Sequence, residues 1–311
     1  MGVLGRDDDP HATAAIDLQR ASSRSVTRAG ALAWFIALAP AAVVVERVDT
    51  PGAVVLGATV PALAYLALVA TIAARARVPV RAPDATFALV WGAGVAAPVA
   101  GHVNDAIQAG VHAGGWFAAV AAPVIEEAAK AAVVVALITV RGTSTRSVRA
   151  GIVIGCAVGI GFGWAENLDY LLLARIQEGV AGLVHAIAIR GFLQGAVHPL
   201  FAAMSGAGVA LARSSVREGR LRPALFGFAG AVAQHAWWNG AASRAVSAIL
   251  CNGTTAAGGC RGNADAAWQF VGVPVIIAVA LAPGVVALIA LAGREQTPMR
   301  ENVSSRGPTP R

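Results

Sequence analysis

Residues 116–140 read WFAAVAAPVIEEAAKAAVVVALITV, a run in which Glu126, Glu127 and Lys130 are the only charged side chains. About 20 apolar residues are enough for an α-helix to cross the hydrocarbon core of a bilayer. A charged side chain in the middle of such a helix costs about 2.5 to 3.5 kcal/mol on insertion scales, and it usually marks a functional site. The stretch therefore predicts a membrane-spanning helix that carries part of a functional site.

The composition of the whole chain points the same way. Of its 311 residues, 57% are hydrophobic and 13% are charged, whereas about a quarter of the residues of a soluble domain are charged. The net charge of +7 comes from arginines in short segments between apolar runs, and Lys130 is the single lysine. This pattern is typical of topology signals and not of a nucleic-acid-binding face. We therefore expect an all-α polytopic membrane helix bundle whose surroundings are the lipid bilayer, with no nucleic-acid partner.

About eight transmembrane helices are predicted from the apolar segments. The bundle occupies residues 29–292, between a polar N-terminal tail, residues 1–28, and a basic C-terminal tail, residues 293–311. Because the polar stretch precedes the first apolar run, we expect no cleavable signal peptide. The predicted spans are 29–45, 52–74, 85–101, 116–140, 150–173, 191–212, 223–243 and 267–292.

The arginines predict the orientation. With the N terminus in the cytosol, 18 arginines fall in cytosolic segments and five fall outside, so the positive-inside rule places both termini in the cytoplasm. We expect a multi-pass protein of the cell membrane, and the Ala- and Arg-rich, Lys-poor composition favours a bacterial source. Cys251 and Cys260 share a predicted outside loop, where a disulfide and two free thiols both remain open.

Four consecutive predicted spans carry polar side chains that are out of place in lipid. Counted from the outer rim of their own spans, Glu127, Glu166, His198 and His235 lie 8 to 11 residues deep. At 1.5 Å per residue these depths are about 12 to 17 Å. We therefore expect the four side chains to meet in the outer half of the membrane.

Helical spacing indicates which faces point inward. Gly151, Gly155, Gly159 and Gly163 form one ridge, which Glu166 and Asn167 continue, and small residues allow close helix approach. Lys130 lies four residues after Glu126 and three after Glu127, so it can pair with either carboxylate. The two glutamates diverge by about 100°, so one is expected to face the site while the other binds Lys130 or supports the first. The simpler alternatives are a neutralising ion pair and hydrogen-bonded core histidines.

This set of side chains suits the hydrolysis of an amide. It can bind one divalent metal ion such as zinc, which activates water, or a buried carboxylate can activate water directly. Asn239 or Asn167 can donate a hydrogen bond to the developing oxyanion. The candidate metal ligands are Glu127, Glu166, His198 and His235. No G-x-S-x-G and no H-E-x-x-H motif occurs in the chain, which argues against serine and zincin chemistry.

The order of these motifs over residues 116–243 resembles that of PrsW-type intramembrane proteases. The resemblance rests on Glu126-Glu127 followed by Lys130, Phe162-x-x-x-Glu166-Asn167, His198, and His235-x-x-x-Asn239. The CAAX-protease and bacteriocin-processing (CPBP) family is more distantly similar, with the pattern EExxxR, FxxxH and HxxxN. Lys130 in place of its arginine, and Glu166 in place of its histidine, fit the PrsW branch better, so prenyl-protein cleavage is not carried over.

The resemblance implies an endopeptidase that cuts a membrane-anchored protein, in the best-known member an anti-sigma factor cut near the outer face. The family has been classed as metallopeptidases, whereas its CPBP relatives can be read as glutamate-dependent without metal. Glu126 or Glu127 would activate water, His198 and His235 would orient it or bind metal, and Asn239 would stabilise the oxyanion. The expected catalytic residues are Glu126, Glu127, Glu166, His198, His235 and Asn239, with Lys130 and Asn167 in support.

Two other functions remain open from the residues alone. A proton-coupled transporter could use the same buried Glu and His side chains as a relay, although their concentration in the outer half of the membrane argues against it. A noncatalytic membrane scaffold is the third reading. The sequence indicates neither the oligomeric state nor the identity of the substrate.

Overall fold

The computed structural model describes residues 52–111, 117–140, 147–214, 221–242, 245 and 266–294, and within these ranges every regular element is a helix. The predicted all-α class is thus confirmed. The predicted first span, the tails up to residue 28 and from residue 295, and both loop cysteines lie outside the described residues. The elements are α2 (Gly52–Arg75), α3 (Ala82–Trp91), η1 (Gly92–Ala96), α4 (Ala97–Val111), η2 (Phe117–Ala121), α5 (Ala122–Val140), α6 (Val148–Ala186), η4 (Ile187–Leu193), α7 (Val197–Ser214), α8 (Arg222–Trp237), η5 (Trp238–Ala242) and α10 (Ala266–Arg294), where η denotes a π-helical segment.

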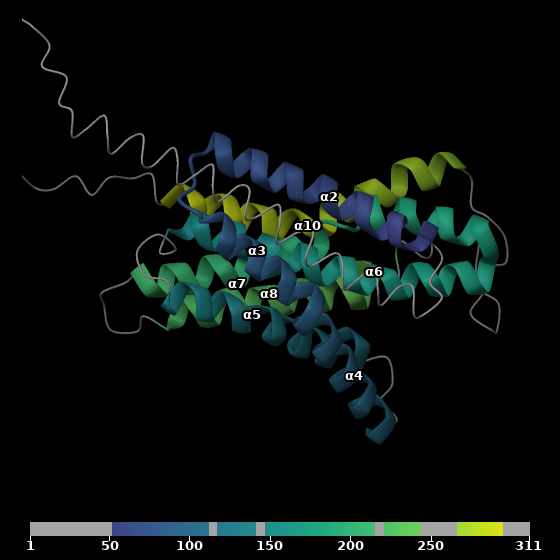
Figure 1. Ribbon diagram of the computed structural model, residues 1–311, viewed down its shortest axis with the longest axis horizontal. Coiled ribbons are helices and arrows are strands. Elements are labelled where there is room, and N and C mark those ends of the chain that lie inside the picture. The colour runs from purple at the N-terminus through teal and green to yellow at the C-terminus, as the bar shows by residue number, and fades with distance from the viewer. Residues whose placement is uncertain are drawn as a thin grey trace, which may run out of the picture.

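The long helices lie side by side as a bundle, and α4 leaves it at an angle (Figure 1). Five helical segments of the described chain are long and apolar enough to cross a membrane. They are Gly52–Arg75, Ala82–Gly110, Val148–Val180, Ile187–Ser214 and Val275–Gly293. The protein is therefore a multi-pass membrane protein, as predicted.

The predicted spans 116–140 and 223–243 are helical as well, but neither is among these five segments. Helix α5 carries three charged side chains, and α8 is only 16 residues long. The predicted third span, 85–101, is shorter than the helical segment found there, because π-helical turns join α3 to α4 and the helix continues to Val111. Asn104 lies on this extension, and its side-chain amide reaches Glu126 of the site described below.

The predicted glycine ridge of α6 packs directly on α7. A Cβ atom added to Gly155 would collide with the backbone of Ala202, and one added to Gly159 would collide with the backbone of His198. Because glycine has no Cβ, the two helix backbones approach closely at these positions. The ridge thereby holds His198, at the start of α7, against α6.

The predicted sixth span is interrupted just before this histidine. The π-helical segment η4 ends at Leu193, a turn follows, and α7 begins at Val197. Pro199 is the third residue of α7, within the first helical turn, where a backbone N–H has no intrahelical partner and proline is tolerated. The break therefore places His198 in the first turn of a new helix.

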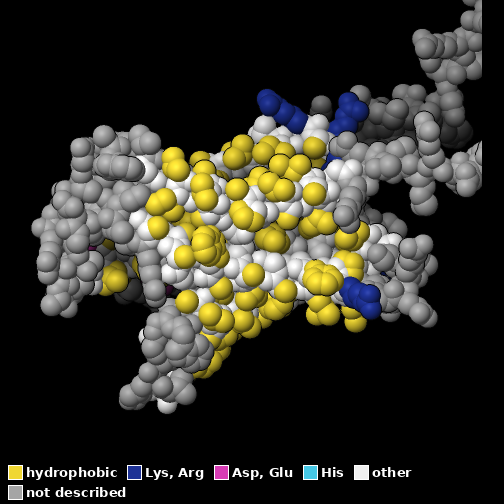
Figure 2. All heavy atoms as spheres, turned by 180° about the vertical axis from the view of Figure 1, so that it is seen from behind, with side chains coloured by type: hydrophobic (Ala, Val, Ile, Leu, Met, Phe, Trp, Pro, Cys, Tyr) yellow, Lys and Arg dark blue, Asp and Glu magenta, His cyan; other side chains and the backbone are white. Residues whose placement is uncertain are grey.

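The described surface is largely apolar, while the largest fully buried side chain is a lysine. Figure 2 shows hydrophobic side chains spread over one face of the bundle, with the visible Lys and Arg side chains at its margins. Lys130 is 0% exposed. An apolar exterior suits a lipid environment, and an enclosed lysine requires polar partners within the bundle.

Candidate active site

The site is built around a buried ion pair within α5. Lys130 Nζ lies 2.7 Å from Glu127 Oε1, and both side chains are almost completely buried. The carboxylate of Glu126 is farther from the lysine, with 3.8 Å between Lys130 Nζ and Glu126 Oε2. Of the two carboxylates that could bind Lys130, Glu127 is thus the closer partner, and the aliphatic stem of the lysine brings its amine into the middle of the bundle.

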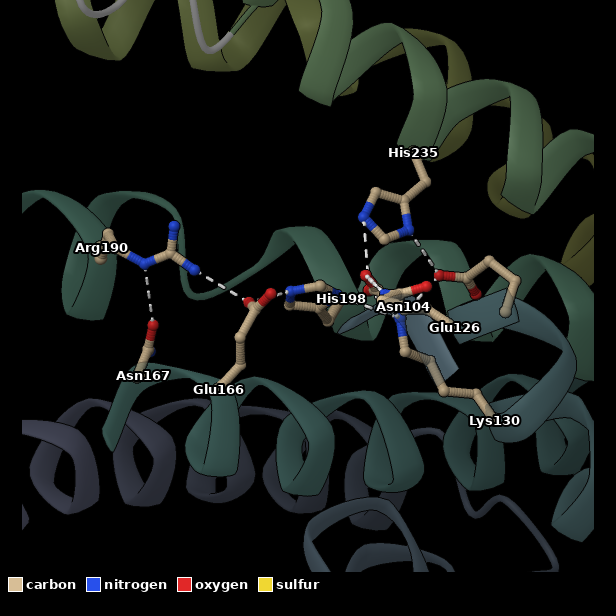
Figure 3. Close-up of polar contacts among 9 residues, drawn as sticks. Asn104, Glu126, Lys130, Glu166, Asn167, Arg190, His198 and His235 are labelled. Carbon is tan, nitrogen blue, oxygen red and sulfur yellow. Dashed lines mark hydrogen bonds and ion pairs between the residues drawn. The ribbon is translucent and has the colours of Figure 1, made fainter. Parts of the chain in front are cut away.

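The same amine contacts His198 from α7, at 3.1 Å from Nδ1. A lysine ammonium group has only donors, so Nδ1 must accept the hydrogen bond. The proton of the neutral imidazole is then on Nε2, which lies 2.8 Å from Glu166 Oε2 and donates to it. His198 thus lies between a cation on one side and a carboxylate on the other (Figure 3).

His235 from α8 adopts the opposite tautomer. Its Nδ1 lies 2.9 Å from Glu127 Oε1, and because a carboxylate only accepts, Nδ1 carries the proton. The lone pair of Nε2 then faces Glu126 Oε2 across 3.7 Å. The ring is stacked on Phe201, with 4.8 Å between ring centroids, which helps to fix its orientation.

Glu166 from α6 is held by Arg190 of η4. Arg190 Nη2 lies 2.8 Å from Glu166 Oε2, and Arg190 Nε donates to Asn167 Oδ1 at 3.3 Å. The guanidinium group lies over the ring of Tyr170, with 3.4 Å from Cζ to the ring centroid. About a quarter of the Glu166 and Arg190 side chains is exposed, so this part of the site is its open end.

Glu126 differs from the other two carboxylates. Its Oε1 accepts a long hydrogen bond, 3.4 Å, from Asn104 Nδ2 of α4. Its Oε2 is buried and has no hydrogen-bond partner, which is also true of Glu127 Oε2, but Glu126 has no cation within hydrogen-bond distance whereas Glu127 has Lys130. A buried carboxylate oxygen without a donor is costly, so an unfilled oxygen beside a histidine lone pair is a candidate for binding water or a cation.

Charge balance singles out the same residue. Glu127 has Lys130 as its cation, and Glu166 has Arg190. With every carboxylate ionised and both imidazoles neutral, Glu126 is left with the one negative charge that no cation neutralises at hydrogen-bond distance. The carboxylate of Glu126 would therefore attract a divalent cation, or the O–H groups of a water molecule.

The residues present fit a divalent metal ion. Among the described residues, Glu126, His198 and His235 each offer one ligand atom, and these atoms lie within 4.8 Å of one another. Zinc binds nitrogen and oxygen at about 2.0 to 2.2 Å, so two of its ligand atoms are at most about 4.2 Å apart. Glu126 Oε2 and His235 Nε2, 3.7 Å apart, satisfy this limit as they stand.

The structure brings together most of the residues predicted from the sequence. Glu126, Glu127, Glu166, His198 and His235 form one connected set with Lys130. Asn167 binds Arg190, and Asn239 lies in η5, four residues after His235. Of the predicted metal ligands, Glu127 and Glu166 hold protein cations, whereas Glu126, which is not in the predicted set, groups with His198 and His235 as a possible ligand.

Two site residues were missed by sequence reasoning. Asn104 lies beyond the predicted end of the third span, and Arg190 was placed among the arginines outside the membrane. A polar amide inside a long helical segment was a usable signal for Asn104. For Arg190 the signal was its place at the rim of the span that carries His198, at a depth from which a long side chain can reach inward.

Comparison with known proteins adds one match. Residues 83–288 match the model of a family described as PrsW family intramembrane metalloprotease. No curated protein and no solved structure matches the chain. The matched segment runs from α3 to α10 and contains all the site residues described above. Since it covers well over half of the sequence, the chain belongs to the PrsW family of intramembrane metalloproteases.

Proposed function

We propose that this protein is an intramembrane endopeptidase in which Glu126, and not Glu127, activates the water that attacks the peptide bond. The observation that carries this proposal is the buried, unpartnered Oε2 of Glu126 facing the Nε2 lone pair of His235 at 3.7 Å. A water molecule between these two acceptors could give a proton to either one.

The other carboxylates have supporting roles. Glu127 accepts from Lys130 and from His235 Nδ1 through the same oxygen, so it fixes the tautomer that turns the lone pair of His235 toward Glu126. Glu166 accepts from His198 and Arg190, so it orients His198. A proton taken up by Glu126 or His235 can then be given to the leaving amine.

One divalent metal ion, zinc in our proposal, would be held by Glu126 and His235, which present the free ligand atoms. When bound, such an ion lowers the pKa of water and polarises the substrate carbonyl. Asn239, one helical turn after His235, is proposed to donate to the oxyanion through its side-chain amide. With the ion bound, Glu126 would activate the water by holding the metal ion; without an ion, Glu126 Oε2 would take the proton of the water directly.

The proposed substrate is a membrane-anchored protein cut near the outer membrane face, such as an anti-sigma factor. We also propose a bacterial cell membrane as the location, with both termini in the cytoplasm. The excess of arginines in the predicted cytosolic segments supports this orientation. The open end of the site, marked by Arg190 and Glu166, lies at the side assigned to the exterior.

The test is cleavage of a co-expressed single-pass membrane protein, repeated with the purified protein in detergent. Glu126→Gln and His235→Ala should each abolish cleavage, while a Gly101→Ala variant, whose added methyl group meets no atom within 4 Å, should cleave normally. Cleavage that survives Glu126→Gln would overturn the assignment of the base.

A further inference from the structure

Both ring nitrogens of His198 are already engaged. Nδ1 accepts from Lys130 at 3.1 Å, and Nε2 donates to Glu166 at 2.8 Å. A histidine binds a metal ion through a nitrogen lone pair. In this arrangement Lys130 holds the lone pair that His198 would need, so His198 can ligate an ion only after the lysine amine leaves Nδ1.

Several contacts keep the lysine amine in place. It lies 2.7 Å from Glu127 Oε1 and 3.9 Å from the centroid of the Phe162 ring, over which it makes a cation–π contact. The residue is 0% exposed, so the amine cannot turn to bulk water. These contacts fix the position of the Lys130 amine within the site.

The three potential ligands are not equivalent. Glu126 Oε2 has no hydrogen-bond partner, and His235 Nε2 keeps its lone pair because Nδ1 donates to Glu127. These two atoms are within the distance that a single zinc ion can bridge. His198 lies close enough to be the third ligand, but both of its ring nitrogens are already hydrogen-bonded to other side chains.

We propose that Lys130 is an internal competitor for the metal ion: by holding His198 Nδ1, it limits the site to two protein ligands, Glu126 and His235. An added positive charge next to the ion also weakens its binding. This inference rests on the proposed metal-assisted function. Its test measures zinc binding without substrate, so its failure leaves the peptidase assignment standing.

The experiment is a double-mutant cycle on zinc affinity, using the full chain purified in detergent and stripped of metal. The variants are Lys130→Met, His198→Ala and the double variant, titrated with zinc against a fluorescent chelator. We expect Lys130→Met to bind zinc at least tenfold more tightly than the unchanged protein. His198→Ala should change the affinity less than threefold alone and should cancel most of the gain in the Lys130→Met background.

Arg190→Gln is the matched control for charge. It removes a cation from the same set of residues but leaves Lys130 on His198 Nδ1. We expect its gain in zinc affinity to stay below threefold. Equal gains for Lys130→Met and Arg190→Gln would overturn the proposal, and so would a tenfold or larger loss of affinity in His198→Ala alone, since His198 would then already be a ligand.

A measurement on the unchanged protein covers the case in which Lys130→Met does not fold. Histidine labelled with ¹⁵N reports which ring nitrogen carries a proton or a metal ion, and the His198→Ala spectrum assigns the His198 signals. We expect zinc to shift the His235 Nε2 signal while His198 keeps its proton on Nε2 and its Nδ1 signal in place. A metal-bound His198 signal when the site first fills would overturn the proposal.

Discussion

Glu126 and His235 face each other across 3.7 Å, from Oε2 to Nε2, and no hydrogen bond joins the two atoms. Every other polar contact of the site joins a donor to an acceptor, whereas this one joins an acceptor to an acceptor. Buried acceptors in proteins usually have a hydrogen-bond donor or a cation as partner, so this pair is a candidate site for a proton, a water molecule or a cation. The predictions below follow from the neighbours that hold this pair.

The two adjacent glutamates should respond differently to the same substitution. Glu126→Gln removes the base and should lower kcat about 10²- to 10⁴-fold, the usual range for a general base, with little effect on Tm. Glu127→Gln leaves Lys130 without its closest counter-charge, and breaking a buried pair costs about 3 to 5 kcal/mol. A thermal-unfolding series in detergent, run beside the cleavage assay, should therefore show the larger fall in Tm for Glu127→Gln.

Arg190 should act on the reaction through Glu166. Arg190→Gln leaves the carboxylate of Glu166 to His198 alone and should lower kcat about 10- to 100-fold, as loss of a residue that orients a site does. Arg190→Lys keeps the charge but not the two-point contact with Glu166 and Asn167, so it should recover part of the rate. Steady-state kinetics separate this effect from substrate binding. An unchanged kcat with a raised KM would instead make Arg190 a substrate-binding residue.

Asn104 should help to position the carboxylate of Glu126. Its amide is the one hydrogen-bond donor found for Glu126 Oε1 among the described residues, and the long bond of 3.4 Å predicts a modest contribution. Asn104→Ala should cost about 1 kcal/mol of stabilisation, which corresponds to a fall in kcat of about fivefold. Gln108→Ala, four residues further along the same helix, serves as the control. Equal activities of the two variants would show that Asn104 does not position Glu126.

The glycines at which α6 packs on α7, here called the glycine seam, should tolerate an added side chain less well than a glycine that faces open space. Gly155→Ala places a methyl group against the backbone of Ala202, so the helices must separate, and overpacking of this kind costs about 1 to 3 kcal/mol. Gly101→Ala meets open space. The Tm of the first variant should fall, and that of the second should be unchanged or higher, since alanine favours helix. A fall of similar size in both would show that the seam tolerates a side chain.

Metal removal should stop the reaction. A chelator should abolish cleavage by the purified protein, and stoichiometric zinc should restore it, with metal analysis giving one ion per chain. The donor atoms of Glu126 and His235 and the unbalanced charge at Glu126 are the basis for this expectation. Full activity in chelator, with no metal detected, would favour direct activation of water by the glutamate.

Much of the site could be predicted because membrane helices follow simple rules of length and depth. Counting residues from the outer rim was enough to place Glu127, Glu166, His198 and His235 at one level, since each helix rises by a constant amount per residue. The glycine spacing predicted the face of α6 that meets α7. These features depend on helical geometry alone, which the sequence encodes locally.

Other features depend on packing that no local pattern encodes. The π-helical turns that carry the helix on to Asn104 and the break before Val197 shift residues relative to an ideal helix. The long side chain of Arg190 reaches from the rim into the site. The tautomers of His198 and His235 follow from their partners on other helices. Which glutamate pairs closely with Lys130, and which is left without a close cation, therefore required the three-dimensional arrangement.

The close contact of α6 with α7 has a consequence for how a substrate reaches the catalytic pair. Gly155 and Gly159 bring the two backbones together, and the hydrogen bond between Glu166 and His198 joins the same two helices farther along. A polypeptide cannot pass through this seam without prying apart the contacts that orient the site. The entrance for a membrane-embedded substrate must therefore lie on another side of the bundle, and cross-links across the seam should leave cleavage intact.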